Sequence, residues 1–72
     1  MTPAQCRAAR GLIHMSQAAL ARAAVVDRST VLDFESGART LQQASRVAIK
    51  RALEAAGVEF TDGRRPGVRL RK

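Results

Sequence analysis

The side chains best suited to recognition chemistry lie in one short segment, between a candidate helix N-cap at Asp27 and a candidate C-cap at Gly37. Helical spacing places one set on the face opposite the apolar pair Val31 and Phe34: Arg28, Ser29, Leu32 and Asp33. An arginine can bond guanine O6 and N7, an aspartate can accept from cytosine N4, and a leucine can touch a thymine methyl group. This face therefore has the chemistry to read base edges. The alternative is a solvated Arg28–Asp33 pair with no direct role.

Two predicted helices position this face. Ser16 is a candidate N-cap for the first helix, whose narrow apolar face consists of Leu20, Ala21 and Ala24. A tight turn leads to Asp27, whose carboxylate is expected to accept from free N–H groups at the start of the second helix. Residues 16–37 are thus predicted to form two short helices joined by a tight turn.

Ten residues match the pattern of a known family: Met15, Ser16, Gln17, Leu20, Ala21, Val26, Thr30, Val31, Glu35 and Gly37. On these residues, the stretch from about residue 3 to 56 closely resembles the lambda-repressor-like (XRE or Cro-type) helix-turn-helix family. The resemblance implies that the second helix lies in the DNA major groove, where Arg28, Ser29, Leu32 and Asp33 are the base-contacting candidates.

The resemblance also assigns residues outside the base-reading face. It implies DNA backbone contacts from Gln17, Thr30 and Arg39, with Gln17 aided by a helix N-terminus. It further implies a structural ion pair between Arg10 and Glu35; the alternative is a surface Arg10.

Two departures from the family pattern affect loops. Val25 stands where the turn glycine is usual, so a β-branched residue there implies strain or an altered turn. Leu41 stands where many relatives have proline, which predicts a less rigid loop.

The remaining elements complete a mainly α fold: a four- to five-helix lambda-repressor-like domain with a short C-terminal β-hairpin or strand pair. Thr2 and Gln5 form a candidate capping box for a helix ending near Leu12 or Ile13. Apolar residues repeating at three and four predict a long helix over residues 41–56, which Gly57 ends, and residues 40–43 resemble another capping box. Residues 1–57 are predicted to form the helix-turn-helix DNA-binding domain, with its motif at 16–37.

Residues 58–72 form a basic β segment and a predicted dimerisation element. Apolar and charged residues alternate there, and one side of the pattern carries Val58, Phe60, Val68 and Leu70 as the dimerisation candidates. Pairing of these strands with a second subunit would leave Arg69, Arg71 and Lys72 on the solvent side. The alternative is a frayed basic tail, which phosphate would still attract.

Charge and composition limit the classes of binding partner that we expect. A formal charge of +7 and a pI near 11.6 on 72 residues predict association with a polyanion. An acidic membrane is disfavoured, because only two residues are aromatic and no helix pairs a bulky apolar face with a lysine-rich one. Without a transmembrane or secretory segment, the expected location is cytoplasmic, nucleoid-associated when bound to DNA.

Cys6 and His14 suggest no catalytic or metal chemistry. With one cysteine and one histidine in the chain, we expect no metal site and no cofactor, and we expect Cys6 to be a buried structural thiol. No glycine-rich phosphate loop or nucleophile–base pair supports an enzyme or a small-molecule ligand.

The functional prediction is a sequence-specific double-stranded DNA-binding transcriptional regulator, such as a repressor, that reads a palindromic operator as a homodimer. The alternative is a protein-interaction module, an antitoxin-like or antiactivator partner using the same fold. An accessible hydrophobic surface on the 41–56 helix or the C-terminal strands would favour this alternative.

Overall fold

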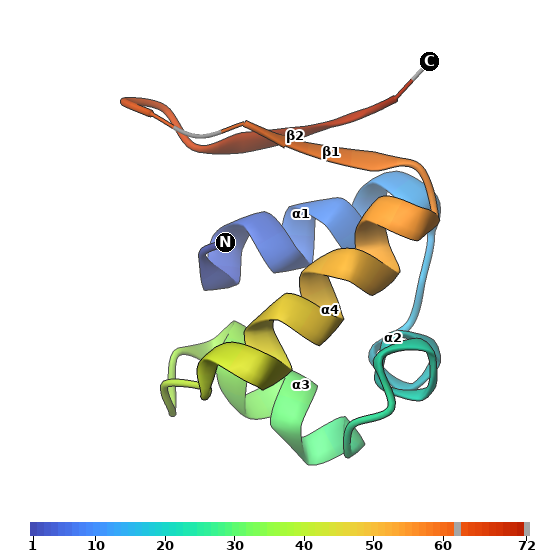
Figure 1. The fold of residues 1–72 in the computed structure, drawn as a ribbon, viewed down its shortest axis with the longest axis vertical. Coiled ribbons are helices and arrows are strands. Elements are labelled where there is room, and N and C mark those ends of the chain that lie inside the picture. The colour runs from blue at the N-terminus through green and yellow to red at the C-terminus, as the bar shows by residue number, and fades with distance from the viewer. Residues whose placement is uncertain (62, 72) are drawn as a thin grey trace.

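The computed structural model describes residues 1–61 and 63–71, which form four helices followed by a hairpin (Figure 1). The elements are α1 (Pro3–Ile13), α2 (Gln17–Ala24), α3 (Arg28–Ser36), α4 (Gln43–Ala55), β1 (Val58–Thr61) and β2 (Gly67–Leu70). The chain is therefore mainly helical with a short antiparallel two-stranded sheet, as predicted. Within these residues no helix has the length and apolar character needed to cross a membrane.

α1 lies between the hairpin and α3, so the molecule is built in layers. Figure 1 shows the hairpin at one end of the long axis, α1 and α4 beneath it, and α3 towards the other end. α1 packs against both strands and against α3, while α4 packs against α2 and β1. The hairpin and α3 therefore use different sides of the same helix.

The core draws side chains from all four helices and from the first strand. The largest fully buried side chains are Cys6, Leu20, Val31, Ile49, Leu53 and Val58. Burying an aliphatic side chain of this size contributes about 1.5–3 kcal/mol. The apolar positions predicted for each helix thus face a common core, and Cys6 is buried as expected.

The helix starts confirm two predicted caps and correct two others. Ser16 is the N-cap of α2, and its hydroxyl accepts from the Ala19 N–H at 3.0 Å. Thr2 and Gln5 form the predicted capping box of α1. Asp27 is the N-cap of α3, but its carboxylate makes no capping hydrogen bond. The capping box expected at residues 40–43 is absent: α4 begins at Gln43 with Gln42 as its N-cap, and Leu41 is buried from the preceding loop.

The C-terminal segment is a hairpin docked on the helices, which corrects the frayed-tail alternative for its described residues. Val58 pairs with Leu70 and Phe60 with Val68, so the predicted alternation holds and these four residues share one face. That face packs on the same chain: Val58 is fully buried and both Phe60 and Val68 pack against the core. Lys72 lies outside the described residues.

This packing corrects the dimerisation prediction for Val58. Its side chain is fully enclosed by its own chain and has no surface left for a second subunit. Of the four candidates, Leu70 is the one with a largely exposed side chain, at 49%. The physical reason is that an isolated two-stranded hairpin is marginally stable, so its apolar face covers the helices beside it.

Candidate nucleic-acid interface

The outer face of α3 presents the predicted base-reading residues to solvent. Arg28, Ser29 and Leu32 are exposed and together line a shallow depression, and the side chain of Leu32 is 47% exposed. Val31, Phe34 and Glu35 are buried on the opposite face of the helix. α3 therefore separates an anchored inner face from an accessible outer face with mixed polar and apolar character.

Asp33, Thr30 and Arg39 form a cluster beside that face. The Arg39 Nη2 donates to Thr30 Oγ1 at 2.8 Å, and its Nε lies 4.0 Å from Asp33 Oδ2. Asp33 thus lies beside Arg39, and no Arg28–Asp33 ion pair forms among the described residues. The arrangement orients Arg39, whose side chain remains 48% exposed, and it does not show the solvated Arg28–Asp33 pair that is the alternative to base contacts by these two residues.

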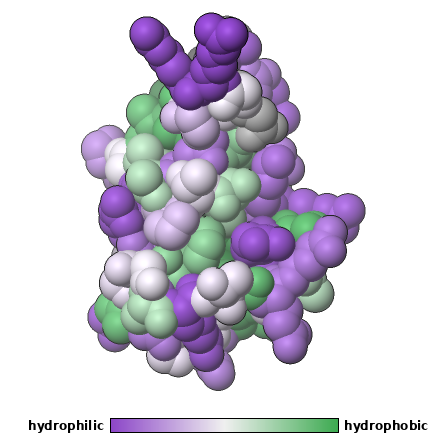
Figure 2. Space-filling model, turned by 90° about the vertical axis from the view of Figure 1, so that its left-hand side faces the viewer, coloured by the Kyte–Doolittle hydropathy of each residue, from purple (hydrophilic) through white to green (hydrophobic). Residues whose placement is uncertain are grey.

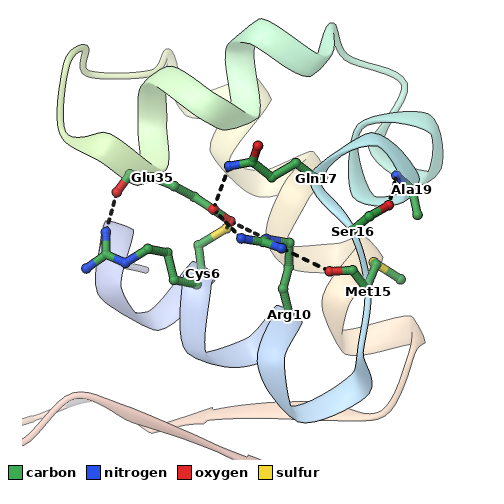
Figure 3. Close-up of polar contacts among 8 residues, drawn as sticks. Cys6, Arg10, Met15, Ser16, Gln17, Ala19 and Glu35 are labelled. Atoms are coloured by element: carbon green, nitrogen blue, oxygen red, sulfur yellow. Dashed lines mark hydrogen bonds and ion pairs between the residues drawn. The ribbon is translucent and has the colours of Figure 1, made fainter.

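The inner face of α3 is held by a polar cluster centred on Glu35 (Figure 3). Arg10 donates from Nε to Glu35 Oε2 at 2.6 Å and from Nη2 to Oε1 at 2.7 Å, a two-pronged contact between α1 and α3. The glutamate side chain is 2% exposed and the arginine 20%. The structure therefore brings Arg10 and Glu35 together as a largely buried pair, and not as a surface arginine.

Gln17 joins this cluster, which differs from its predicted role. Its Nε2 donates to Glu35 Oε1 at 3.0 Å, so the amide points towards the interior of the motif (Figure 3). The contact ties the first turn of α2 to the last turn of α3. In this arrangement Gln17 positions α3 through Glu35, while the Ser16 hydroxyl accepts from the Ala19 N–H in the first turn of α2.

Two further contacts to Glu35 have no signal in the sequence pattern. The Cys6 thiol donates to Glu35 Oε2 at 3.2 Å, and Arg7 Nη1 donates to the Glu35 backbone oxygen at the end of α3. Arg10 also donates to the Met15 backbone oxygen at 3.0 Å. The cluster thus joins α1, α2 and α3 with each buried side-chain polar atom of the described residues partnered.

Charge and burial within the cluster shift three pKa values. Burial raises the pKa of the Cys6 thiol to about 12, and the hydrogen bond to Glu35 adds to the effect, so the thiol stays protonated. The hydrogen bond to Glu35 raises the pKa of Arg10. Burial alone would raise the pKa of Glu35, but hydrogen bonds from Arg10, Gln17 and Cys6 outweigh it and lower that pKa.

No protein-family model matches the chain, and no curated protein sequence matches it.

The three-residue connection between α2 and α3 carries backbone strain at the predicted position. Val25 has φ +58° and ψ +49°, in the left-handed region, and its side chain is 89% exposed. A β-branched residue is unfavourable in this conformation and gains little from burial here. A glycine at this position would remove the strain, because glycine adopts the left-handed region freely.

Positive charge is distributed unevenly over the chain. Residues 16–37 carry two basic and three acidic residues, a net of −1, whereas residues 58–72 carry five basic and two acidic residues, a net of +3. Residues 1–15 add +2 and residues 38–57 add +3, which restores the total of +7. Residues 16–37 therefore contribute no net positive charge to the total that predicts polyanion binding.

A buried glutamine, Gln5, fixes the hairpin that carries much of this charge. Its Nε2 donates to the backbone oxygens of Thr61 and Gly67, each at 3.0 Å, while its Oε1 accepts from Thr2 N–H. The sequence indicated the capping contact alone. Lys50 Nζ lies 5.6 Å from the centre of the Phe60 ring and links α4 to the hairpin as well.

Proposed function

We propose that the chain is a sequence-specific double-stranded DNA-binding protein of the lambda-repressor-like helix-turn-helix type. It would act as a small transcriptional regulator, with α3 in the major groove and α2 as its supporting helix. One observation carries the proposal: Arg28, Ser29 and Leu32 are exposed together on α3, while Glu35 holds the inner face of the same helix to α1 and α2.

Rigid presentation of α3 supports base reading. Contacts between Glu35 and both Arg10 and Gln17 restrict the orientation of α3, so less conformational freedom is lost when its outer face meets DNA. Arg28 at the N-terminal end of α3 suits guanine, and Leu32 one turn later suits a thymine methyl group. Arg39, oriented by Thr30 and Asp33, suits a neighbouring phosphate.

A homodimer completes the proposal. One nine-residue helix offers few base contacts, whereas two copies on a two-fold axis read half-sites about 34 Å, or one DNA turn, apart. The dimer would form through surface that the chain leaves exposed, such as Leu70 and the outer edge of β2.

Selection from a random duplex library tests the proposal. The purified protein should enrich one sequence motif with two-fold symmetry, and Arg51→Ala, at an exposed position on α4, should enrich the same motif. Arg28→Ala should relax one position in each half-site. Recovery of unenriched sequences by the wild-type protein contradicts sequence-specific reading and favours the protein-interaction alternative.

A further inference from the structure

The hairpin presents a basic tip at the end of the molecule opposite α3. Arg64 and Arg65 are exposed in the turn between β1 and β2, and Arg69 and Arg71 are exposed along the second half of the segment. Figure 2 shows hydrophilic side chains projecting from the end of the molecule where the hairpin lies. We refer to Arg64, Arg65 and the turn that carries them as the basic tip.

The acidic side chains of the hairpin segment neutralise only part of its positive charge. Within residues 1–61 and 63–71, Glu59 pairs with Arg69, and no ion pair includes Arg64 or Arg65. Asp62 lies next to the tip but outside these residues, and counting its charge still leaves the segment at +3. Such a concentration of arginine has a strong attraction for a polyanion.

The hairpin holds the tip in place. Gln5 bonds the backbone oxygens of Thr61 and Gly67, the residues on either side of the turn. Arg71 donates from its backbone to Gly57 at 2.7 Å and from its side chain to the Glu54 backbone oxygen at 3.2 Å. A ribbon fixed at both ends presents its arginines with less loss of freedom on binding than a frayed tail would.

Within one protomer, the basic tip and the outer face of α3 cannot bind the same stretch of duplex. α1 packs with one side on α3, through Arg10 and Glu35, and with another side on the hairpin, through Gln5. Because the inner face of α3 meets α1, the outer face of α3 points away from the hairpin (Figure 1). A duplex bound at that outer face therefore leaves the basic tip uncovered.

We propose that the basic tip binds the phosphate backbone of a second DNA duplex, so that the protein holds two duplex segments together. A two-stranded ribbon fits a DNA groove, and the guanidinium fork matches phosphate oxygens. The exposed tip has no aromatic or large apolar side chain, which disfavours both base stacking on single strands and insertion into a membrane. This inference goes beyond the proposed function, because it requires no sequence reading by α3.

A co-capture experiment tests the second site. A biotinylated duplex of arbitrary sequence is fixed on beads, protein is added, and retention of a second, fluorescent duplex is measured from 50 to 200 mM salt. The wild-type protein should retain the second duplex. R64Q/R65Q should lower retention about tenfold and reduce the log–log salt slope by about 1.8, at about 0.9 per lost phosphate contact.

Two controls distinguish loss of this site from a general loss of positive charge and from unfolding of the protein. R51Q removes one charge from an exposed position on α4, as R64Q or R65Q alone does at the tip, and should change retention less than about twofold. Circular dichroism and the unfolding midpoint of R64Q/R65Q should match the wild type, because both side chains are exposed.

The outcomes distinguish the two proposals. Unchanged retention in R64Q/R65Q overturns the second site and assigns any bridging to the two α3 helices of a dimer. Binding of the first duplex without retention of the second, or no duplex binding at all, also overturns it. Loss of vesicle binding in R64Q/R65Q, with co-capture unchanged, would assign the tip to an anionic lipid surface instead. Arginine-dependent co-capture without an enriched motif upholds the second site while sequence-specific reading fails.

Discussion

Residues 16–37 and residues 58–72 use polar side chains in opposite ways. In the first segment, Glu35 and Gln17 are drawn inward and fix one helix against its neighbours. In the second, the apolar face is drawn inward and the arginines are left in solvent. The comparison teaches that the segment with the proposed base-reading residues carries a net charge of −1, whereas the hairpin segment carries +3, so the proposed sequence reading and much of the electrostatic attraction have different locations.

The largest contrast is expected between two ion pairs. Arg10→Ala or Glu35→Ala should lower the free energy of unfolding by about 3 kcal/mol, because each leaves a partly buried charge without its partner. Arg69→Ala breaks the exposed pair with Glu59 in the hairpin and should cost less than about 1 kcal/mol. Urea titration of the variants measures both, and equal losses in the two regions would remove the contrast.

A double variant sharpens the same comparison. Arg10→Met with Glu35→Leu replaces the pair by apolar side chains of similar size and should cost less than either single change to alanine, because no charge is stranded. A double loss equal to the sum of the single losses would show that the two residues act independently.

Acid should weaken the motif through Glu35. Its pKa in the folded protein lies below the ordinary value of 4.5, so the stability it contributes is fully present above pH 4.5 and is lost as pH falls through the lowered value. Urea titrations between pH 7 and pH 3 should therefore show a steeper decline for the wild type than for Glu35→Gln. Parallel curves for the two proteins would contradict the lowered pKa.

The hairpin should depend on Gln5 more than on its own ion pair. Gln5→Ala removes two hydrogen bonds to hairpin carbonyls and should cost about 2 kcal/mol, at about 1 kcal/mol for each bond. Hydrogen exchange of the hairpin amides should accelerate more than that of α2. Gln43→Ala, at an exposed position in α4, is the matched control and should change stability by less than about 0.5 kcal/mol. Unchanged exchange in Gln5→Ala would show that Gln5 does not hold the hairpin.

The smallest expected effect is a gain in stability. Val25→Gly should raise the free energy of unfolding by about 1 kcal/mol, because glycine adopts the left-handed conformation of this turn without strain and little buried surface is lost. Thermal unfolding measures the change. A lower melting temperature in Val25→Gly would show that the valine side chain contributes more than its strain costs.

Local signals predicted most of the fold. The capping box of α1, the glycine that ends α3 and the alternation of the hairpin each depend on neighbouring residues, and each is present. The start of α4 was misplaced because Leu41 continues the helical apolar repeat, although it reaches the core from a loop. Periodicity alone does not distinguish these two routes to burial.

The candidate site was less predictable where contacts join distant residues. The amide of Gln17 turns to Glu35, 18 positions away, and that of Gln5 turns to a hairpin more than 50 positions away. Neither distance leaves a local pattern. The buried position of Val58 likewise depends on the helices beside it, which is why the alternating pattern indicated a face but not what covers it.

Reading of bases by α3 is tested most directly by measuring binding of wild-type protein and Arg28→Ala to the selected duplex and to each of its single-base variants. Binding by the wild-type protein should weaken by about 1–3 kcal/mol when the base pair that Arg28 contacts is replaced. Arg28→Ala should bind duplexes with each of the four base pairs at that position with similar affinity. Losses at the other positions should stay as they are in the wild type. An Arg28→Ala protein that keeps the full wild-type preference at every position would contradict the role of α3 as the recognition helix.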